Sequence, residues 1–162
     1  MLMKDKKYAK TTAWVLFAVY CAVMVYLLFI QRLINCGFDI TQLAVPDYAA
    51  AVSERFEPYP LRTVIEFIGR VESISPDDLA FRNLAGNIVL FIPAGIFLPL
   101  LFRPQRRFAV FLLTFAGVIC VIELLQMFTL LGSCDIDDLL LNTAGASAGC
   151  GIYRLITRFT RP

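Results

Sequence analysis

The first long uncharged stretch of the chain runs from Ala13 to Ile30, and its residues are almost all apolar. An α-helix of this length rises about 27 Å, close to the thickness of the hydrocarbon core of a bilayer. Three further apolar runs follow, at residues 84–102, 108–131 and 139–156. The pattern predicts an all-α, polytopic membrane protein with four transmembrane helices in one domain that covers residues 1–162.

The composition supports a lipid environment. Hydrophobic residues make up 59% of the chain, against roughly 45–50% in ordinary soluble domains. A soluble fold of 162 residues has too little interior to hide so many apolar side chains. We therefore expect much of the apolar surface to face lipid.

The basic residues predict the orientation of the four helices. Cytoplasmic loops carry an excess of Lys and Arg, so both termini and the connection between the second and third helices are placed in the cytoplasm. The residues on that side are Lys4, Lys6, Lys7, Lys10, Arg103, Arg106, Arg107, Arg154, Arg158 and Arg161. The opposite side receives Arg32, Arg55, Arg62, Arg70 and Arg82.

Residues 31–82 form a long first extracytoplasmic loop in this arrangement. Within it, apolar residues recur at helical spacing after the prolines Pro58 and Pro60 and predict an amphipathic helix. Such a helix could lie on the outer membrane surface or pack over the bundle, and the period is the same in both cases. The apolar positions are Leu61, Val64, Ile65, Ile68, Val71 and Ile74.

Several classes of function are excluded by composition. The chain has no histidine, so Ser-His-Asp and Cys-His nucleophile systems and His-ligated zinc sites are ruled out. Its five cysteines show no CxxC spacing and indicate neither a disulfide framework nor a metal knuckle. A net charge of +2 gives no reason to expect a nucleic-acid partner.

Polar residues gather at the outer ends of the last three apolar runs. Glu123 lies about 12 Å inside the third, where a carboxylate costs on the order of 3 kcal/mol unless it is neutral, paired or facing a wet cavity. Gln126 shares its helix face. We expect these side chains to converge on a ligand-binding polar cluster made of Asn83, Asn87, Glu123, Gln126, Asp135, Asp137, Asp138 and Asn142.

Small residues indicate where the helices approach one another. Gly145 and Gly149 stand four residues apart on the side of the fourth helix that carries Asn142, which favours a close helix–helix contact. Ala116, Gly117 and Cys120 predict a similar contact on the third helix, because they extend the face of Glu123 inward.

The polar cluster allows more than one interpretation. It could be an interhelical hydrogen-bond network that holds the bundle together, with the aspartates capping a helix. It could instead be a pocket open to the outer leaflet, or part of a proton pathway, although the inner halves of the helices offer no ionisable residue to continue one. The run Asp135–Asp138 could also take Mg²⁺ or Ca²⁺, but it lacks the EF-hand spacing.

Three blocks of sequence, in this order, resemble the VanZ-like family of bacterial membrane proteins. They are Asn-Leu-Ala-Gly-Asn-Ile-Val-Leu-Phe-Ile-Pro from Asn83, Glu-Leu-Leu-Gln from Glu123, and Asp-Ile-Asp-Asp-Leu-Leu-Leu-Asn-Thr-Ala-Gly from Asp135. Glu-Pro-Tyr-Pro-Leu-Arg-Thr from Glu57 is similar to a shorter block of that family. The resemblance implies that seven residues of the polar cluster are the family's characteristic polar positions, namely Asn87, Glu123, Gln126, Asp135, Asp137, Asp138 and Asn142.

The resemblance implies a multi-pass protein of the bacterial plasma membrane that affects susceptibility to the glycopeptide teicoplanin. Its expected partners are membrane lipid and, through the polar cluster, a lipid-linked cell-wall precursor or the glycopeptide. Two alternatives remain: a membrane enzyme that uses Glu and Asp, with or without a divalent metal, on a lipid-linked substrate, and a structural or assembly subunit. The sequence assigns no catalytic residue, cofactor or oligomeric state.

Overall fold

The computed structural model describes residues 2–35, 47–60, 65, 69 and 79–160. The described chain is mainly helical, which confirms the all-α prediction. Its long elements are α1 (Leu2–Val25), which continues through the π-helix η1 (Tyr26–Ile30) into α2 (Gln31–Asn35), then α5 (Leu79–Leu101), α6 (Phe108–Phe128) and α7 (Ile136–Thr160). The short elements are α3 (Tyr48–Ser53), β1 (Phe56–Glu57), the 3-10 helix η4 (Arg103–Arg106) and β2 (Cys134–Asp135).

Three of the described helical segments are long and apolar enough to cross a membrane. They are Tyr8–Asn35, Leu84–Leu101 and Phe108–Phe128. Large apolar side chains such as Leu113 on α6 point outward and are exposed, as expected of a surface that faces lipid. The fourth predicted segment lies in α7, which is long enough to span but less apolar than the other three.

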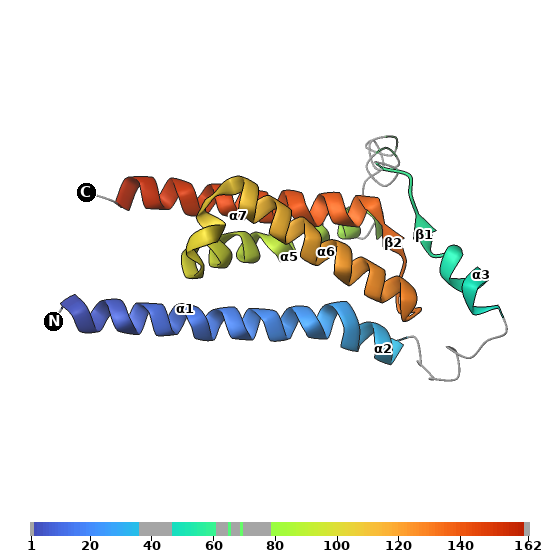
Figure 1. The fold of residues 1–162 in the computed structure, drawn as a ribbon, viewed down its shortest axis with the longest axis horizontal. Helices are drawn as coiled ribbons and strands as arrows, with labels where there is room; N and C mark the ends of the chain where they lie inside the picture. The colour runs from blue at the N-terminus through green and yellow to red at the C-terminus, as the bar shows by residue number, and fades with distance from the viewer. Residues whose placement is uncertain (1, 36–46, 61–64, 66–68, 70–78, 161–162) are drawn as a thin grey trace.

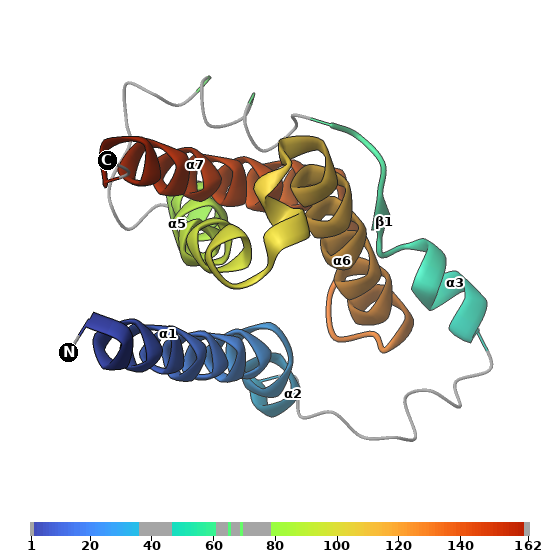
Figure 2. The same cartoon turned by 60° about the vertical axis from the view of Figure 1, so that its left-hand side comes forward.

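The long helices run alongside one another, and both ends of the chain lie at the same end of the molecule (Figure 1). The connection η4 lies at that end too, because Arg154 Nη2 of α7 donates a hydrogen bond to the Arg106 carbonyl at 3.0 Å. The elements α3, β1 and β2 lie at the opposite end (Figure 1). Figure 2 shows α5, α6 and α7 gathered together with α1 to one side.

Glycines allow α5 and α7 to pack backbone against backbone. A Cβ added at Gly145 would lie 2.1 Å from the Ile88 carbonyl oxygen, and one added at Gly149 would lie 2.0 Å from that of Ile92. Gly95 of α5 approaches the α7 backbone in the same way. The contact predicted from the two glycines of α7 is therefore confirmed, and close approach of this kind is how helices associate where apolar burial gives no advantage over lipid.

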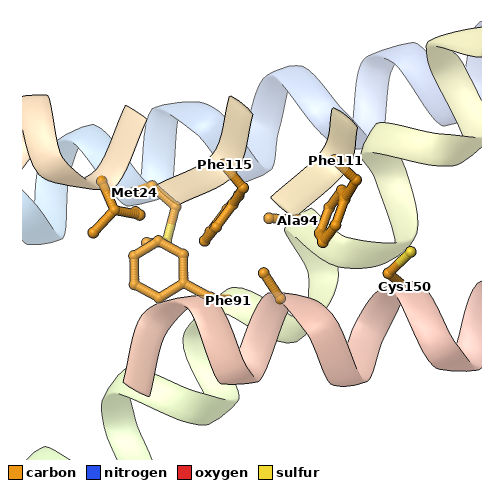
Figure 3. Packing of buried hydrophobic residues seen from close by; sticks show 8 residues of the cluster. Met24, Phe91, Ala94, Phe111, Phe115 and Cys150 are labelled. Atoms are coloured by element: carbon orange, nitrogen blue, oxygen red, sulfur yellow. The ribbon is translucent and has the colours of Figure 1, made fainter. Parts of the chain in front are cut away.

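The apolar core fills the space among the four long helices (Figure 3). Three phenylalanines are its largest side chains, with Phe91 of α5 edge-on to Phe115 of α6 at 5.8 Å between ring centroids. Small residues of α5 and α7 lie beneath these rings. The buried cluster contains Met24, Phe91, Ala94, Phe111, Phe115, Ile119, Ala146 and Cys150.

Pro93 lies inside α5 without ending the helix, as predicted. A proline cannot donate its backbone hydrogen bond, and neighbouring side chains can satisfy the carbonyls that it disturbs. Here the Tyr20 hydroxyl of α1 donates to the Leu90 carbonyl, three residues before the proline, at 3.0 Å.

The predicted end of the third helix at residue 131 is wrong by three residues. α6 ends at Phe128 because Leu130 takes a left-handed conformation with φ 58°. The backbone N–H groups of Leu130 and Leu131 then donate to the carbonyls of Met127 and Gln126 at 3.1 and 3.0 Å. This is a Schellman motif, which usually has glycine where the chain has Leu130.

One predicted contact of α6 is wrong. Among the described residues, no atom outside the local backbone lies within 4 Å of a Cβ added at Gly117, and Cys120 is exposed. The buried face of α6 passes through Phe111, Phe115 and Ile119 instead. The predicted amphipathic helix over residues 61–74 lies outside the described residues, apart from two isolated positions.

Candidate functional site

Glu123 and Gln126 both face the interior of the bundle, as their spacing on α6 predicts. Their side chains are 5% and 1% exposed. They continue the buried face that runs through Ile119 at one-turn intervals. The acid and the amide therefore do not face lipid, where each would lack polar partners.

Gln126 links α6 to the first helix through both ends of its amide. Its Nε2 donates to the Leu28 carbonyl at 2.8 Å, and its Oε1 accepts a hydrogen bond from Arg32 Nη1 at 3.3 Å. Leu28 lies in the π-helical segment η1, where the chain winds more loosely than in an α-helix. Such segments occur often at functional sites.

Arg32 is the cation of this cluster, which we call the outer polar cluster and define as Arg32, Asn87, Glu123, Gln126, Asp135 and Asp138. Gly132 makes room for Arg32, since a Cβ at that position would lie 2.2 Å from Arg32 Nη1. The arginine charge acts on both Glu123 and Asp138. The contacts of Arg32 with the polar cluster were not predicted from the sequence, in which Arg32 counted only as one of the charges of residues 31–82.

The aspartates form the start of α7, as predicted, although the helix begins three residues before the expected residue 139. Asp135 Oδ1 accepts the backbone N–H of Asp137 at 2.8 Å, which is the hydrogen bond of an N-cap residue. Asp137 in the first turn is 1% exposed. Two acidic residues in this turn suit the partial positive charge of a helix N-terminus.

Asn87 joins α5 to α7 by donating a hydrogen bond from Nδ2 to Asp138 Oδ1. Asp138 precedes the apolar part of α7. Burial raises the pKa of Asp138 from an ordinary 3.8 to about 6, and the Asp135 charge acts in the same direction. The charge of Arg32 and the hydrogen bond from Asn87 oppose this shift without cancelling it.

Because its pKa is raised on folding, Asp138 predicts a pH dependence of stability. The folded protein binds the proton more tightly than the unfolded chain, so this contribution is fully present below about pH 4 and is lost as pH rises through about 6. Asp138→Asn should remove this part of the slope while keeping an acceptor for Asn87. Melting temperatures of both proteins in detergent from pH 4 to 7 measure it, with exposed Asp47→Asn as the control. Parallel curves for the wild type and Asp138→Asn would contradict the prediction.

A short parallel pairing of two strands brings residues 55–57, from the segment between α2 and α5, to the cluster. β1 pairs with β2 so that Glu57 lies opposite Asp135, and the Cys134 N–H donates to the Arg55 carbonyl at 2.8 Å. The Tyr48 hydroxyl also donates to the Phe128 carbonyl at 2.5 Å, at the end of α6. This pairing places Glu57 beside Asp135, so that Glu57 is a further acidic residue next to the cluster. The only sequence signal for it was its place at the start of a family block.

Four buried side-chain oxygens lack a hydrogen-bond partner among the described residues, and two of them belong to predicted site residues. These two are Glu123 Oε2 and Asn142 Oδ1, on side chains that are 5% and 4% exposed. The backbone N–H of Asp135 interacts with the Glu123 carboxyl group, so one side of that group is served from the protein. Buried acceptors without donors are costly, and a donor from a bound molecule would relieve the cost.

The structure brings together five of the eight predicted site residues, namely Asn87, Glu123, Gln126, Asp135 and Asp138. Asp137 and Asn142 are buried close by on the same helix, at positions next to Asp138 and one turn beyond it. The side chain of Asn83 lies outside the described part of the chain. Within residues 2–35, 47–60 and 79–160, no group of three or more Cys, Asp or Glu side chains is arranged to hold a metal ion.

Comparison with known proteins confirms the resemblance. A model of the VanZ/LLP1 family matches residues 17–157. A curated protein of Enterococcus faecium, Protein VanZ, is 29% identical over 102 residues, which make up 60% of this chain. The match covers 61% of that protein, so the chain spans about three fifths of the length of this relative. No solved structure matches the chain.

Proposed function

Since the chain belongs to the VanZ/LLP1 family, we propose that it is a multi-pass protein of the bacterial plasma membrane whose outer polar cluster binds the headgroup of a lipid or a lipid-linked cell-wall precursor. Through this site it alters susceptibility to glycopeptide antibiotics such as teicoplanin. The observation that carries the proposal is the buried Glu123 carboxyl group, which has one oxygen without a donor among the described residues and lies beside Arg32 and Asp138.

The proposal includes four crossings with both termini in the cytoplasm. At 25 residues, α7 rises about 37 Å, which is long enough to cross the hydrocarbon layer. The side of α7 that carries Gly145 and Gly149 packs against α5. That side is therefore covered by protein and does not require apolar side chains for contact with lipid. The connection η4 and the chain ends share one end of the molecule and carry a majority of the basic residues, which supports the orientation (Figure 1).

The chemistry of the outer polar cluster suits a headgroup. Its carboxylates accept hydrogen bonds from ammonium, hydroxyl or amide groups, and a guanidinium binds phosphate in a bidentate manner. Lipids and lipid-linked precursors combine phosphate with such donors. Asp137 is nearly fully buried in the first turn of α7, and its backbone N–H donates to Asp135.

Two substitutions test the proposal. Glu123→Gln and Asp137→Asn keep the shape of each side chain but remove a negative charge, so we expect both to abolish protection against teicoplanin while the protein still inserts. The inhibitory concentration of teicoplanin for a bacterial host that expresses each variant measures protection, and immunoblots of membranes measure insertion. Exposed Asp47→Asn is the matched control. Full protection by both inserted variants would contradict the assignment.

A structural role is the second candidate, because three hydrogen bonds of the cluster join different helices. These are the bonds from Gln126 to Leu28, from Arg32 to Gln126 and from Asn87 to Asp138. A purely structural cluster predicts that thermal stability and protection fall together in Glu123→Gln. A headgroup site predicts that protection is lost even where the melting temperature stays within a few degrees of the wild type.

A further inference from the structure

An apolar groove of about 270 Å³ separates the first helix from the rest of the bundle. Its walls come from α1 and η1 on one side and from α5 and α6 on the other. Residues that line it include Phe17, Leu28, Phe91, Leu98, Val118 and Ile122. Its volume is close to the lower limit of small-molecule sites.

The first helix touches the bundle at both ends of the groove and also between them. Toward the chain ends, Trp14 packs edge-on against Phe102 at 5.3 Å between ring centroids. Toward the opposite end, Gln126 holds the Leu28 carbonyl and Arg32.

Between these levels the Tyr20 hydroxyl donates to the Leu90 carbonyl at 3.0 Å. The groove is the space that these contacts leave open between α1 and the other helices. Figure 2 shows α1 to one side of the α5–α6–α7 group.

The groove lies next to the outer polar cluster, and the two meet at Leu28 and Ile122. Leu28 lines the groove, and its carbonyl accepts the hydrogen bond from Gln126. Ile122 also lines the groove and directly precedes Glu123. A molecule that occupies both places must therefore have a hydrocarbon part and a polar part, and it must reach the site from the membrane.

The charges of the cluster indicate what the polar part carries. Within the described residues, the carboxyl groups of Glu123 and Asp138 share the charge of a single guanidinium, that of Arg32, and the carboxyl group of Asp135 adds negative charge beside both. The buried acceptor Glu123 Oε2 lacks a donor there. A positively charged group with N–H donors meets both conditions, while a phosphate next to it would suit Arg32.

We propose that the groove binds a hydrocarbon chain of a glycerophospholipid whose headgroup carries a primary ammonium group, with the headgroup in the outer polar cluster. This inference rests on the proposed function and names the ligand class of that same site. The ammonium group donates to the Glu123 carboxyl group, and the phosphate pairs with Arg32. The hydrocarbon chain covers the apolar walls of the groove between α1 and the other helices.

Phosphatidylethanolamine and phosphatidylcholine provide a matched pair of probes, because both are zwitterionic but only the first has ammonium N–H donors. The full chain would be purified in detergent, incubated with each lipid at equal acyl composition, and analysed by native mass spectrometry. We expect phosphatidylethanolamine to be retained about tenfold more, as one charge-assisted hydrogen bond would give. Equal retention of the two lipids would overturn the headgroup assignment.

Two valines of α6 test the groove itself. Val118 lines the groove and is 52% exposed, whereas Val121 is 56% exposed and is not among the lining residues. Val118→Trp should fill the groove and reduce retained phosphatidylethanolamine about tenfold, since a few buried methylenes are displaced. Val121→Trp should retain it as the wild type does. Thr114→Phe, also on the lining, replaces Val118→Trp if that variant does not fold.

The two proposals fail in different ways. Unchanged lipid retention in a folded Val118→Trp variant overturns the groove, even where Glu123→Gln has lost teicoplanin protection. Full protection in Glu123→Gln and Asp137→Asn overturns the proposed function, even where Val118→Trp has lost its lipid.

Discussion

Replacement of Arg32 by leucine is expected to lower the free energy of unfolding by about 2 kcal/mol, the range for a hydrogen bond that involves a charged group. The substitution removes the donor to Gln126 Oε1 and leaves Glu123 and Asp138 without the positive charge that acts on them. Buried carboxyl groups that lose their counter-charge are costly, whereas the apolar stem of the arginine is replaced by leucine.

Chemical unfolding in detergent at pH 7 measures this effect. Arg32→Lys is the control that keeps the charge, and it should lose less than half as much as Arg32→Leu because only the geometry of the fork is lost. The deficit of Arg32→Leu should shrink at pH 4, where the carboxyl groups take up protons. A leucine variant as stable as the wild type at pH 7 would mean that Arg32 belongs to the surface alone.

Replacement of Gly149 by alanine should disrupt the contact between α5 and α7. The added Cβ would lie 2.0 Å from the Ile92 carbonyl oxygen and 2.9 Å from its carbon, and a helix backbone cannot give way like the end of a flexible side chain. Overpacking in a tight core typically costs about 1–3 kcal/mol, and we expect at least the upper end here because backbone meets backbone.

Gly151, two residues along the same helix, is the matched control. A Cβ added at Gly151 would have no atom of another described helix or strand within 4 Å. Gly151→Ala should be neutral or stabilise the protein by up to about 1 kcal/mol, through the higher helix propensity of alanine. Melting temperatures in detergent compare the two variants, and similar melting temperatures would refute the close packing of α5 on α7.

Much of this architecture follows from the sequence because local patterns decide it. Long apolar runs predicted the helices, and the glycines at Gly145 and Gly149 predicted the face of α7 that touches α5. The aspartates predicted the start of α7, since their side chains suit the free N–H groups of a helix N-terminus. Burial of Glu123 followed from the energetic cost of a carboxylate in lipid.

Other features depend on contacts between distant segments, which no local pattern reveals. The first helix passes through a π-helical segment that ends at Ile30 and continues as α2 to Asn35. Arg32 therefore lies in a helix of the bundle and not in a loop. The pairing of β1 with β2 joins residues 78 positions apart along the chain. Small residues on α6 were misleading, because a small residue can lie on the outer face of a bundle as well as at a helix–helix contact. Gly117 and Cys120 lie on the outer face.

The central claim is that acidic, amide and basic side chains from separate helices share one chamber below the outer surface. A double-mutant cycle of Arg32→Leu and Glu123→Gln, followed by the free energy of unfolding in detergent, tests it most directly. A shared chamber predicts a coupling of at least about 1 kcal/mol between the two substitutions. Effects that add to within about 0.3 kcal/mol would show that the two residues do not share a site.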